Sequence, residues 1–208
     1  MLRKLRQIWK AKDIRSSILY VLALLVVFRI AAHIPVPGVD VNALRDIFSS
    51  NQALGLLNMF SGGAMQNFSI VMLGVGPYIT SSIIFQLLTM IIPKLEALSK
   101  EGDYGRQKIN QYTRLLTIPL AVIQGYSFLR LLSSQTGGAL LGDMHAFQLV
   151  TTIIIITTTT IFLMWLGELI SEKHIGNGVS LLIFAGIVAG LPQSLRNTAI
   201  GFDNTMVL

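Results

Sequence analysis

Apolar residues along this chain gather in five stretches, and the segments between them are rich in charged residues, glycine or polar side chains. The stretches cover residues 18–34, 70–92, 115–132, 147–170 and 179–191. Because a helix needs roughly 20 mostly apolar residues to cross the hydrocarbon core of a bilayer, each stretch is predicted to be a membrane helix. The pattern therefore predicts an all-α membrane protein with five transmembrane helices in a membrane domain of residues 18–191.

The fifth stretch is short for a span. As a helix, residues 179–191 would extend only about 20 Å. We therefore predict that Gly176, Asn177 and Gly178, which come just before it, lie at or near membrane depth. They should face protein or water, because lipid cannot satisfy an irregular backbone.

The segment that leads into and through the second stretch has a mixed character. Residues 56–67, LLNMFSGGAMQN, are too apolar for an ordinary loop and too rich in glycine and amides for a helix exposed to lipid. Val75 and Ile79 would share one helix face, with Thr80 and Gln86 on neighbouring faces. An apolar constriction beside polar groups is one way in which a pore excludes water. Ordinary packing through small residues is the simpler interpretation of the same pattern.

The composition supports a membrane protein. Of 208 residues, 52% are hydrophobic and 12% are charged, whereas a soluble domain is about 25% charged. The chain has no cysteine, which excludes disulfides and thiolate chemistry. Its three histidines, His33, His145 and His174, are far apart in the sequence, so neither a metal site nor another cofactor is predicted.

The basic residues are distributed unevenly between the two sides of the predicted membrane domain. Twelve Lys and Arg lie in residues 1–17, in residues 93–114 and at Lys173, against two to four on the opposite side. Membrane proteins carry their excess of Lys and Arg on the cytoplasmic side. The basic arm of residues 1–17 is therefore predicted to be cytoplasmic. Residues 192–208, which turn apolar again at the end, are predicted to be an external segment that leads into a missing sixth span.

The motifs and the positions of ionisable residues bear on several classes of function. The sequence has no HExxH, Gly-x-Gly-Asp or GxxxxGK[ST] motif, so we expect no enzymatic activity. A transporter half built on inverted repeats is a stronger alternative, because broken helices are typical of substrate sites. The ionisable candidates for such a site, Arg29 and Glu168, lie near span ends, where we expect them to snorkel to the interface. A membrane scaffold without a pore is a third alternative.

Five stretches, in the same order over nearly the whole chain, together resemble one protein family. They are FRIAAHIPVPGVD (28–40), MFSGGAMQNFSI (59–70), LGVGPYITSSIIFQLL (73–88), KEGDYGRQKINQYTR (100–114) and FLMWLGELISEKHIGNGVSLLIFAGIVAGLP (162–192). The family that they resemble is SecY, the channel subunit of the Sec protein translocase.

The resemblance implies one half of a larger channel in the plasma membrane of a prokaryote. SecY-like channels have ten helices in two inverted five-helix halves, and this chain is similar to the N-terminal half. The expected partners are the C-terminal half, SecE and SecG-like small subunits, membrane lipids, and the SecA ATPase or the ribosome on the cytoplasmic side. Signal peptides and nascent polypeptides would be the substrates of a protein-conducting channel for secretion and membrane insertion.

The resemblance also implies roles for individual residues. A short re-entrant plug helix, which fills the idle channel from the external side, would comprise Leu56, Leu57, Asn58, Met59, Phe60, Ser61, Gly62, Gly63, Ala64, Met65, Gln66 and Asn67. An apolar pore ring would include Val75, Ile79 and Ile183. A lateral gate, where signal sequences enter, would include Thr80, Ile83, Gln86 and Ile123. In the cytoplasmic loop of residues 100–114, the expected partner contacts are Lys100, Arg106 and Lys108.

Overall fold

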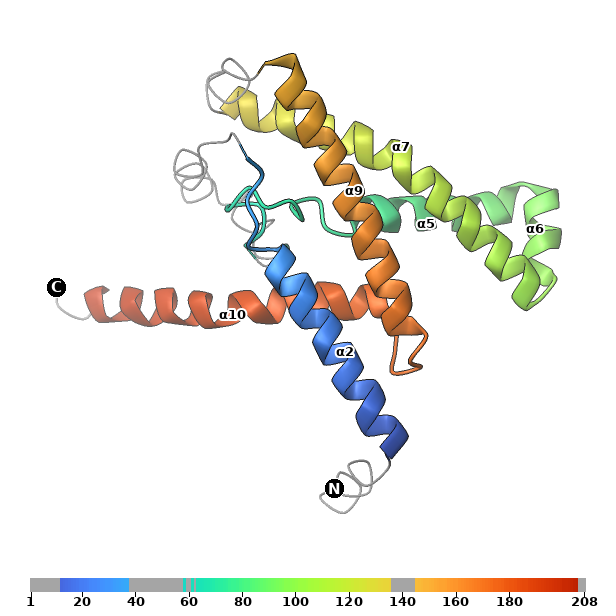
Figure 1. Cartoon of the computed structure of the whole chain (residues 1–208), viewed down its shortest axis with the longest axis horizontal. Helices are drawn as coiled ribbons and strands as arrows, with labels where there is room; N and C mark the ends of the chain where they lie inside the picture. The colour runs from blue at the N-terminus through green and yellow to red at the C-terminus, as the bar shows by residue number, and fades with distance from the viewer. Residues whose placement is uncertain (1–11, 38–57, 59–60, 62, 136–144, 206–208) are drawn as a thin grey trace.

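The computed structural model describes residues 12–37, 58, 61, 63–135 and 145–205. Its helices are α2 (Lys12–Ala31), α5 (Gly76–Ile91), α6 (Pro93–Lys100), α7 (Asp103–Gln135), α9 (Ala146–Ser171) and α10 (Gly178–Thr205) (Figure 1). Apart from one isolated bridge between Pro35 and Ser69, these residues form helices, turns and irregular chain. The prediction of an all-α fold is confirmed for this part of the chain.

Three helices, α2, α7 and α9, are long and apolar enough to cross a membrane. Together α5 and α6 pass the same test, but they are bent by 103° at their junction, so they form either a fourth span or a re-entrant element. The apolar part of α10, Gly178–Gly190, is shorter. A helical membrane protein with three or four candidate spans is therefore established, and the fifth span stays a prediction.

Proline positions explain where α5 and α6 begin. Pro77 lies in the first turn of α5, where a helix does not use the backbone donor that proline lacks. Ile92, which precedes Pro93, is extended, with φ −97° and ψ 113°, as the residue before a proline prefers. The chain therefore leaves α5 at Ile92 and starts α6 in a new direction.

The helix of the second predicted span, 70–92, begins only at Gly76. The backbone N–H of Ile70 donates to the carbonyl of Ile34 (3.0 Å), and the N–H of Val36 donates to the carbonyl of Phe68 (2.9 Å). After this bridge the chain forms turns in which Met72 donates to Ser69 and Gly74 to Val71. Gly74 has a left-handed φ of +55°, so a regular helix starts only after it.

Two helices extend beyond the apolar stretches that predicted them. Much of the expected cytoplasmic loop 100–114 is helical, because α7 begins at Asp103. Residues 192–205 continue α10 through Pro192, and their external position stays a prediction. An apolar stretch marks only the part of a helix that suits lipid, whereas a helix can continue through polar residues.

The other two long helices lie close to their predicted bounds. Helix α2 ends at Ala31, whereas the first predicted stretch ends at residue 34. Helix α9 differs from the predicted 147–170 by one residue at each end.

The helices pack around the pair α7 and α9. Helix α5 packs along α7, while α9 also contacts α2 and α10 (Figure 1). Ser81 of α5 is buried, and its hydroxyl donates to the carbonyl of Thr113 in α7 (2.7 Å). One buried apolar cluster joins α2, residues 71–75, α9 and α10 through Phe28, Val75, Leu166 and Leu182. This cluster lies directly beside the candidate site described below.

A close backbone approach joins the end of α9 to the start of α10. Gly178 is buried, and its N–H donates to the hydroxyl of Ser171 (2.8 Å). A Cβ atom at Gly178 would overlap the carbonyl of Gly167 and lie 2.9 Å from the Cβ of Ile170. Gly176, predicted like Gly178 to lie near membrane depth, is exposed and has no atom near the position of a Cβ.

We therefore expect Gly178→Ala to destabilise the protein while Gly176→Ala does not. The added methyl group forces α9 and α10 apart, at a cost of about 1–3 kcal/mol or more in the free energy of unfolding. Thermal unfolding of the purified protein in detergent measures the effect. Gly176→Ala is the matched control and should change the free energy of unfolding by less than about 0.5 kcal/mol. Equal stability of the two variants would contradict the close contact.

Candidate functional site

A cavity of about 240 Å³ lies where α5 begins. It is lined by residues from α2, from segment 61–65, from the turn before α5, and from α5, α9 and α10. The lining residues are Phe28, Ser61, Met65, Val71, Met72, Leu73, Gly74, Val75, Gly76, Ile79, Leu163, Leu182, Ile183 and Gly186. Ser61 is the one polar side chain among them, so the wall of the cavity is almost entirely apolar.

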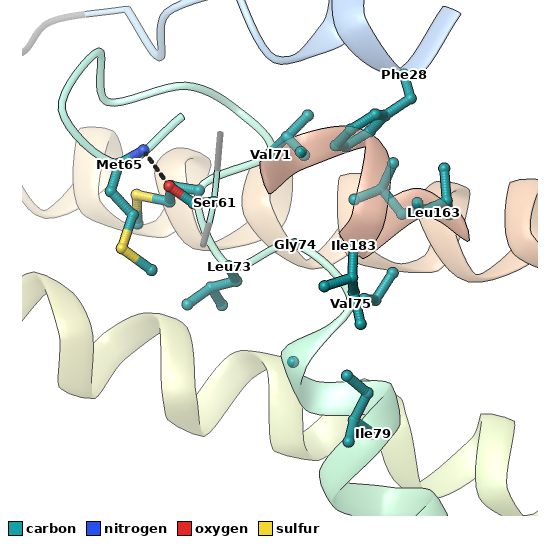
Figure 2. Close-up of a pocket in the computed structure, with 14 residues that line it drawn as sticks. Phe28, Ser61, Met65, Val71, Leu73, Gly74, Val75, Ile79, Leu163 and Ile183 are labelled. Carbon is teal, nitrogen blue, oxygen red and sulfur yellow. Dashed lines mark hydrogen bonds between the residues drawn. The ribbon is translucent and has the colours of Figure 1, made fainter. Parts of the chain in front are cut away.

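All three residues predicted for the pore ring line this cavity. Val75 and Ile79 come from the start of α5 and Ile183 from the second turn of α10. Figure 2 shows Val75 beside Ile183, with Ile79 further along α5. Val75 is buried, and Ile79 and Ile183 are partly buried against the same apolar cluster. The structure thus brings together side chains that lie more than a hundred positions apart in the sequence.

The turn before α5 determines how Val75 and Ile79 are presented. Gly74 has a left-handed φ that glycine adopts at little cost, and Val75 is the N-cap residue of α5. The carbonyl of Val75 accepts a bond from the N–H of Ile79 (3.0 Å), which is the first turn of the helix. Both side chains therefore point from the beginning of α5 into the cavity rather than from the middle of a long helix.

Residues Ser61 and Met65, from the predicted plug, also line the cavity. Within this segment Asn58 is the main hydrogen-bonding residue. Its carbonyl accepts from the N–H of Gly63 and the hydroxyl of Ser61, both at 2.9 Å. Its side chain accepts from the N–H of Gln66 and donates to the Gln66 side chain, also at 2.9 Å. The N–H of Met65 donates to the Ser61 hydroxyl (3.2 Å; Figure 2).

Among the described residues of the predicted plug helix, Asn58 is helical, whereas residues 61 and 63–67 form turns. Gly63 has a left-handed φ of +85°, and the side chains of Asn58 and Ser61 take backbone donors that a helix would use itself. Five residues of the predicted plug lie outside the described part of the chain: Leu56, Leu57, Met59, Phe60 and Gly62.

The predicted lateral gate residues lie along α5 and α7, away from most of the cavity wall. The hydroxyl of Thr80 donates to the carbonyl of Gly76 (3.1 Å) and accepts from the side chain of Gln124 on α7 (3.5 Å). Ile83 and Ile123 are 51% and 61% exposed. They form part of an apolar surface that nothing in this chain covers within the described residues. Gln124 was missed by the sequence analysis, because only the packing of α5 on α7 brings it to Thr80.

The predicted partner contacts surround the elbow between α6 and α7. Lys100 forms an ion pair with Glu96 one turn earlier (2.6 Å), and Lys108 lies over the ring of Tyr104 (5.8 Å). Arg106 lines a second, polar groove of about 390 Å³ together with Gln86, a residue of the predicted gate. Exposed contacts within one helix are weak, so the neighbours of Lys100 and Lys108 hold these two cations only loosely.

Glu168 was predicted to snorkel to the membrane interface, and this stays a prediction. Its carboxylate forms an ion pair with Arg114 of α7, with Nε 2.6 Å from Oε1. The side chain of Glu168 is 25% exposed and that of Arg114 46%.

The sequence did not predict the apolar residues Phe28, Leu163 and Leu182 of the cavity wall. Nothing in their local sequence distinguishes them from residues of an ordinary core.

These features define a class: a multi-pass helical membrane protein whose helices converge on a small apolar cavity. A SecY family model matches residues 69–207. Protein translocase subunit SecY of Streptomyces galbus is 45% identical over 206 residues, covering 94% of this chain and 47% of its own length. The same subunit of Vibrio cholerae is 44% identical over 188 residues, covering 89% and 42%. The chain belongs to the SecY family, and it spans about half the length of the curated relatives that it matches.

We expect Asn58→Ala to release the turn that carries Ser61 and Met65. The substitution removes both side-chain bonds to Gln66, and each such bond contributes about 0.5–1.5 kcal/mol. A cysteine placed at Met65 in this cysteine-free chain should then react with a thiol reagent about five-fold faster or more, which corresponds to about 1 kcal/mol. Asn110→Ala on the exposed surface of α7 is the control and should leave the rate unchanged. The hydrogen-bonded turn is refuted if Asn58→Ala also leaves it unchanged.

Proposed function

We propose that this chain is the N-terminal half of a protein-conducting channel that secretes polypeptides and inserts membrane proteins. The observation that carries the proposal is the cavity in which Val75, Ile79 and Ile183 meet Ser61 and Met65. The relatives named as protein translocase subunits support it. The C-terminal half would supply the remaining members of the pore ring.

The pore ring acts as an apolar seal. Water leaves a narrow apolar constriction readily, so such a ring blocks ions without a tight steric seal. Branched aliphatic side chains offer no hydrogen bonds to a passing polypeptide, so the ring can yield to the polypeptide without retaining it. Because Val75 and Ile79 stand at the beginning of α5, where the backbone turns at Gly74, a small movement of this turn widens the constriction.

The plug closes the same cavity from one side. The plug can leave the cavity without breaking its own hydrogen bonds, because the bonds of Asn58 run to Ser61, Gly63 and Gln66 within the segment. A segment that satisfies its own donors and acceptors leaves few unpaired polar groups behind when it moves. The contact with the cavity is made by the apolar side chain of Met65 and the small side chain of Ser61, which costs little to break.

The lateral gate lies on the exposed apolar face of α5 and α7, at Thr80, Ile83, Gln86 and Ile123. In the closed channel this face packs against the C-terminal half. A hydrophobic signal sequence binds the open gate better than the closed one, and this difference in affinity shifts the balance toward the open state. Opening the gate moves α5, and with it the ring.

The partner proteins and the orientation of the chain in the membrane are proposed from its membership of the SecY family. SecE and SecG-like subunits stabilise the channel in the plasma membrane, and the N-terminal arm faces the cytoplasm. SecA or the ribosome supplies the motive force on that side, where Lys100, Arg106 and Lys108 are available for contact. Residues 192–205 of α10 lie on the external side.

Cysteine cross-linking tests the proposal. Single variants Ile79→Cys and Thr80→Cys are co-expressed with the C-terminal half, in the presence of a stalled secretory polypeptide that carries one cysteine. We expect the mature region to cross-link to position 79 and the signal sequence to position 80. Ile154→Cys, on an exposed part of α9, is the control and should not react. If neither position 79 nor position 80 reacts in an assembled complex, the ring and the gate are assigned wrongly.

A further inference from the structure

The ion pair between Arg114 and Glu168 joins two helices at a point where charge is scarce. Glu168 is the single charged residue of α9, and Arg114 is the single charged residue of α7 between Lys108 and Arg130. An ionisable residue in or near a membrane span is costly and usually has a function and a partner. Here each of the two residues is the partner of the other.

The pair lies at one end of the contact between two antiparallel helices. Gly125 of α7 packs against Ile156 of α9. Arg114 lies eleven residues before Gly125, and Glu168 lies twelve residues after Ile156. The side chains of these two residues form the ion pair. Because apolar surfaces can slide past each other at little cost, a directional contact between charged groups at one end is what specifies a single register.

The pair also lies next to both elements that carry the pore ring. Ser81 of α5, two residues after Ile79, donates from its hydroxyl to the carbonyl of Thr113, the residue before Arg114 (2.7 Å). Gly167, which precedes Glu168, packs against Val179 and Leu182 of α10, and Leu182 precedes Ile183. A shift of α9 against α7 would therefore move α10 relative to α5.

We infer that Arg114 and Glu168 are positioning residues for the pore ring. Their ion pair holds α7 and α9 in one register, and this register sets the position of Ile183 on α10 relative to Ile79 on α5. The inference rests on the proposed function, because it takes these two side chains as parts of the ring. It predicts that breaking the pair changes the geometry of the ring although neither residue lines the cavity.

The test measures this geometry directly in the assembled channel, in the idle state. Ile79→Cys and Ile183→Cys are combined, and their linkage by a short bifunctional thiol reagent is followed over time. The chain has no other cysteine. This pair of cysteines is examined in the otherwise unchanged chain, in Glu168→Gln, in Arg114→Gln, and in the charge-swapped chain with Arg114→Glu and Glu168→Arg. Glu96→Gln is the matched control, because it removes an ion pair of the same 2.6 Å length that lies within one helix.

We expect each single substitution to lower the linkage rate about two- to five-fold, the range that a partly exposed ion pair can supply. The charge-swapped chain should restore the rate to within about two-fold, and Glu96→Gln should leave it unchanged. Unchanged rates in both single variants, or no recovery in the charge-swapped chain, would overturn the inference. If a single variant does not accumulate in the membrane, the charge-swapped chain decides by the same criterion.

Ion leakage through the idle channel separates this inference from the proposed function. Ile79→Gly should leak if Ile79 belongs to a sealing ring. Without leakage in Ile79→Gly the ring itself is wrong, whatever the linkage rates show. With leakage in Ile79→Gly but unchanged linkage in Glu168→Gln and Arg114→Gln, the ring stands and only the positioning role is lost.

Discussion

The backbone of residues 34–36 is hydrogen-bonded to residues 68–70, just after the end of α2. Val36 donates to Phe68 and Ile70 to Ile34, while the buried hydroxyl of Ser69 donates to the carbonyl of Ala31 (3.0 Å). Irregular backbone within a membrane protein is tolerated only where protein or water satisfies its polar groups. These bonds meet that requirement, and they tie the segment before α5 to α2.

The position of the cavity depends on the chain that follows these bonds. Met72 donates to Ser69, Gly74 to Val71 and Gly76 to Leu73 in successive turns, and Gly74 has a left-handed φ. Helix α5 therefore starts at Gly76, and Val75 is its N-cap residue. The side chains of Val75 and Ile79 then line the cavity together with residues of α9 and α10, and Ser61 and Met65 line it too. A continuous helix from residue 70 would instead have presented Val75 from the interior of a helix, with no turn to bring segment 61–65 nearby.

Different contacts hold the helices around the cavity. The approach of Gly167 to Gly178 makes α9 and α10 a close-packed unit. The bond from Ser81 to Thr113 and the packing of α5 along α7 make a second unit. Large apolar side chains remain exposed on α5, among them Met90 at 80% and Ile91 at 74%. Such a surface needs lipid or another protein to cover it.

The amino-acid sequence by itself determined the class of this protein, because composition and long apolar stretches are local properties that a bilayer selects directly. It located α9 to within one residue at each end and the apolar part of α7, and the family resemblance pointed to Val75, Ile79 and Ile183. Periodicity alone could not separate these three from ordinary packing residues. Only the tertiary structure decided where α5 begins, how Asn58 folds the segment beside the cavity, and which residue neutralises Glu168. Each of these depends on hydrogen bonds or ion pairs that no helical or apolar pattern records, most of them between residues far apart in the chain.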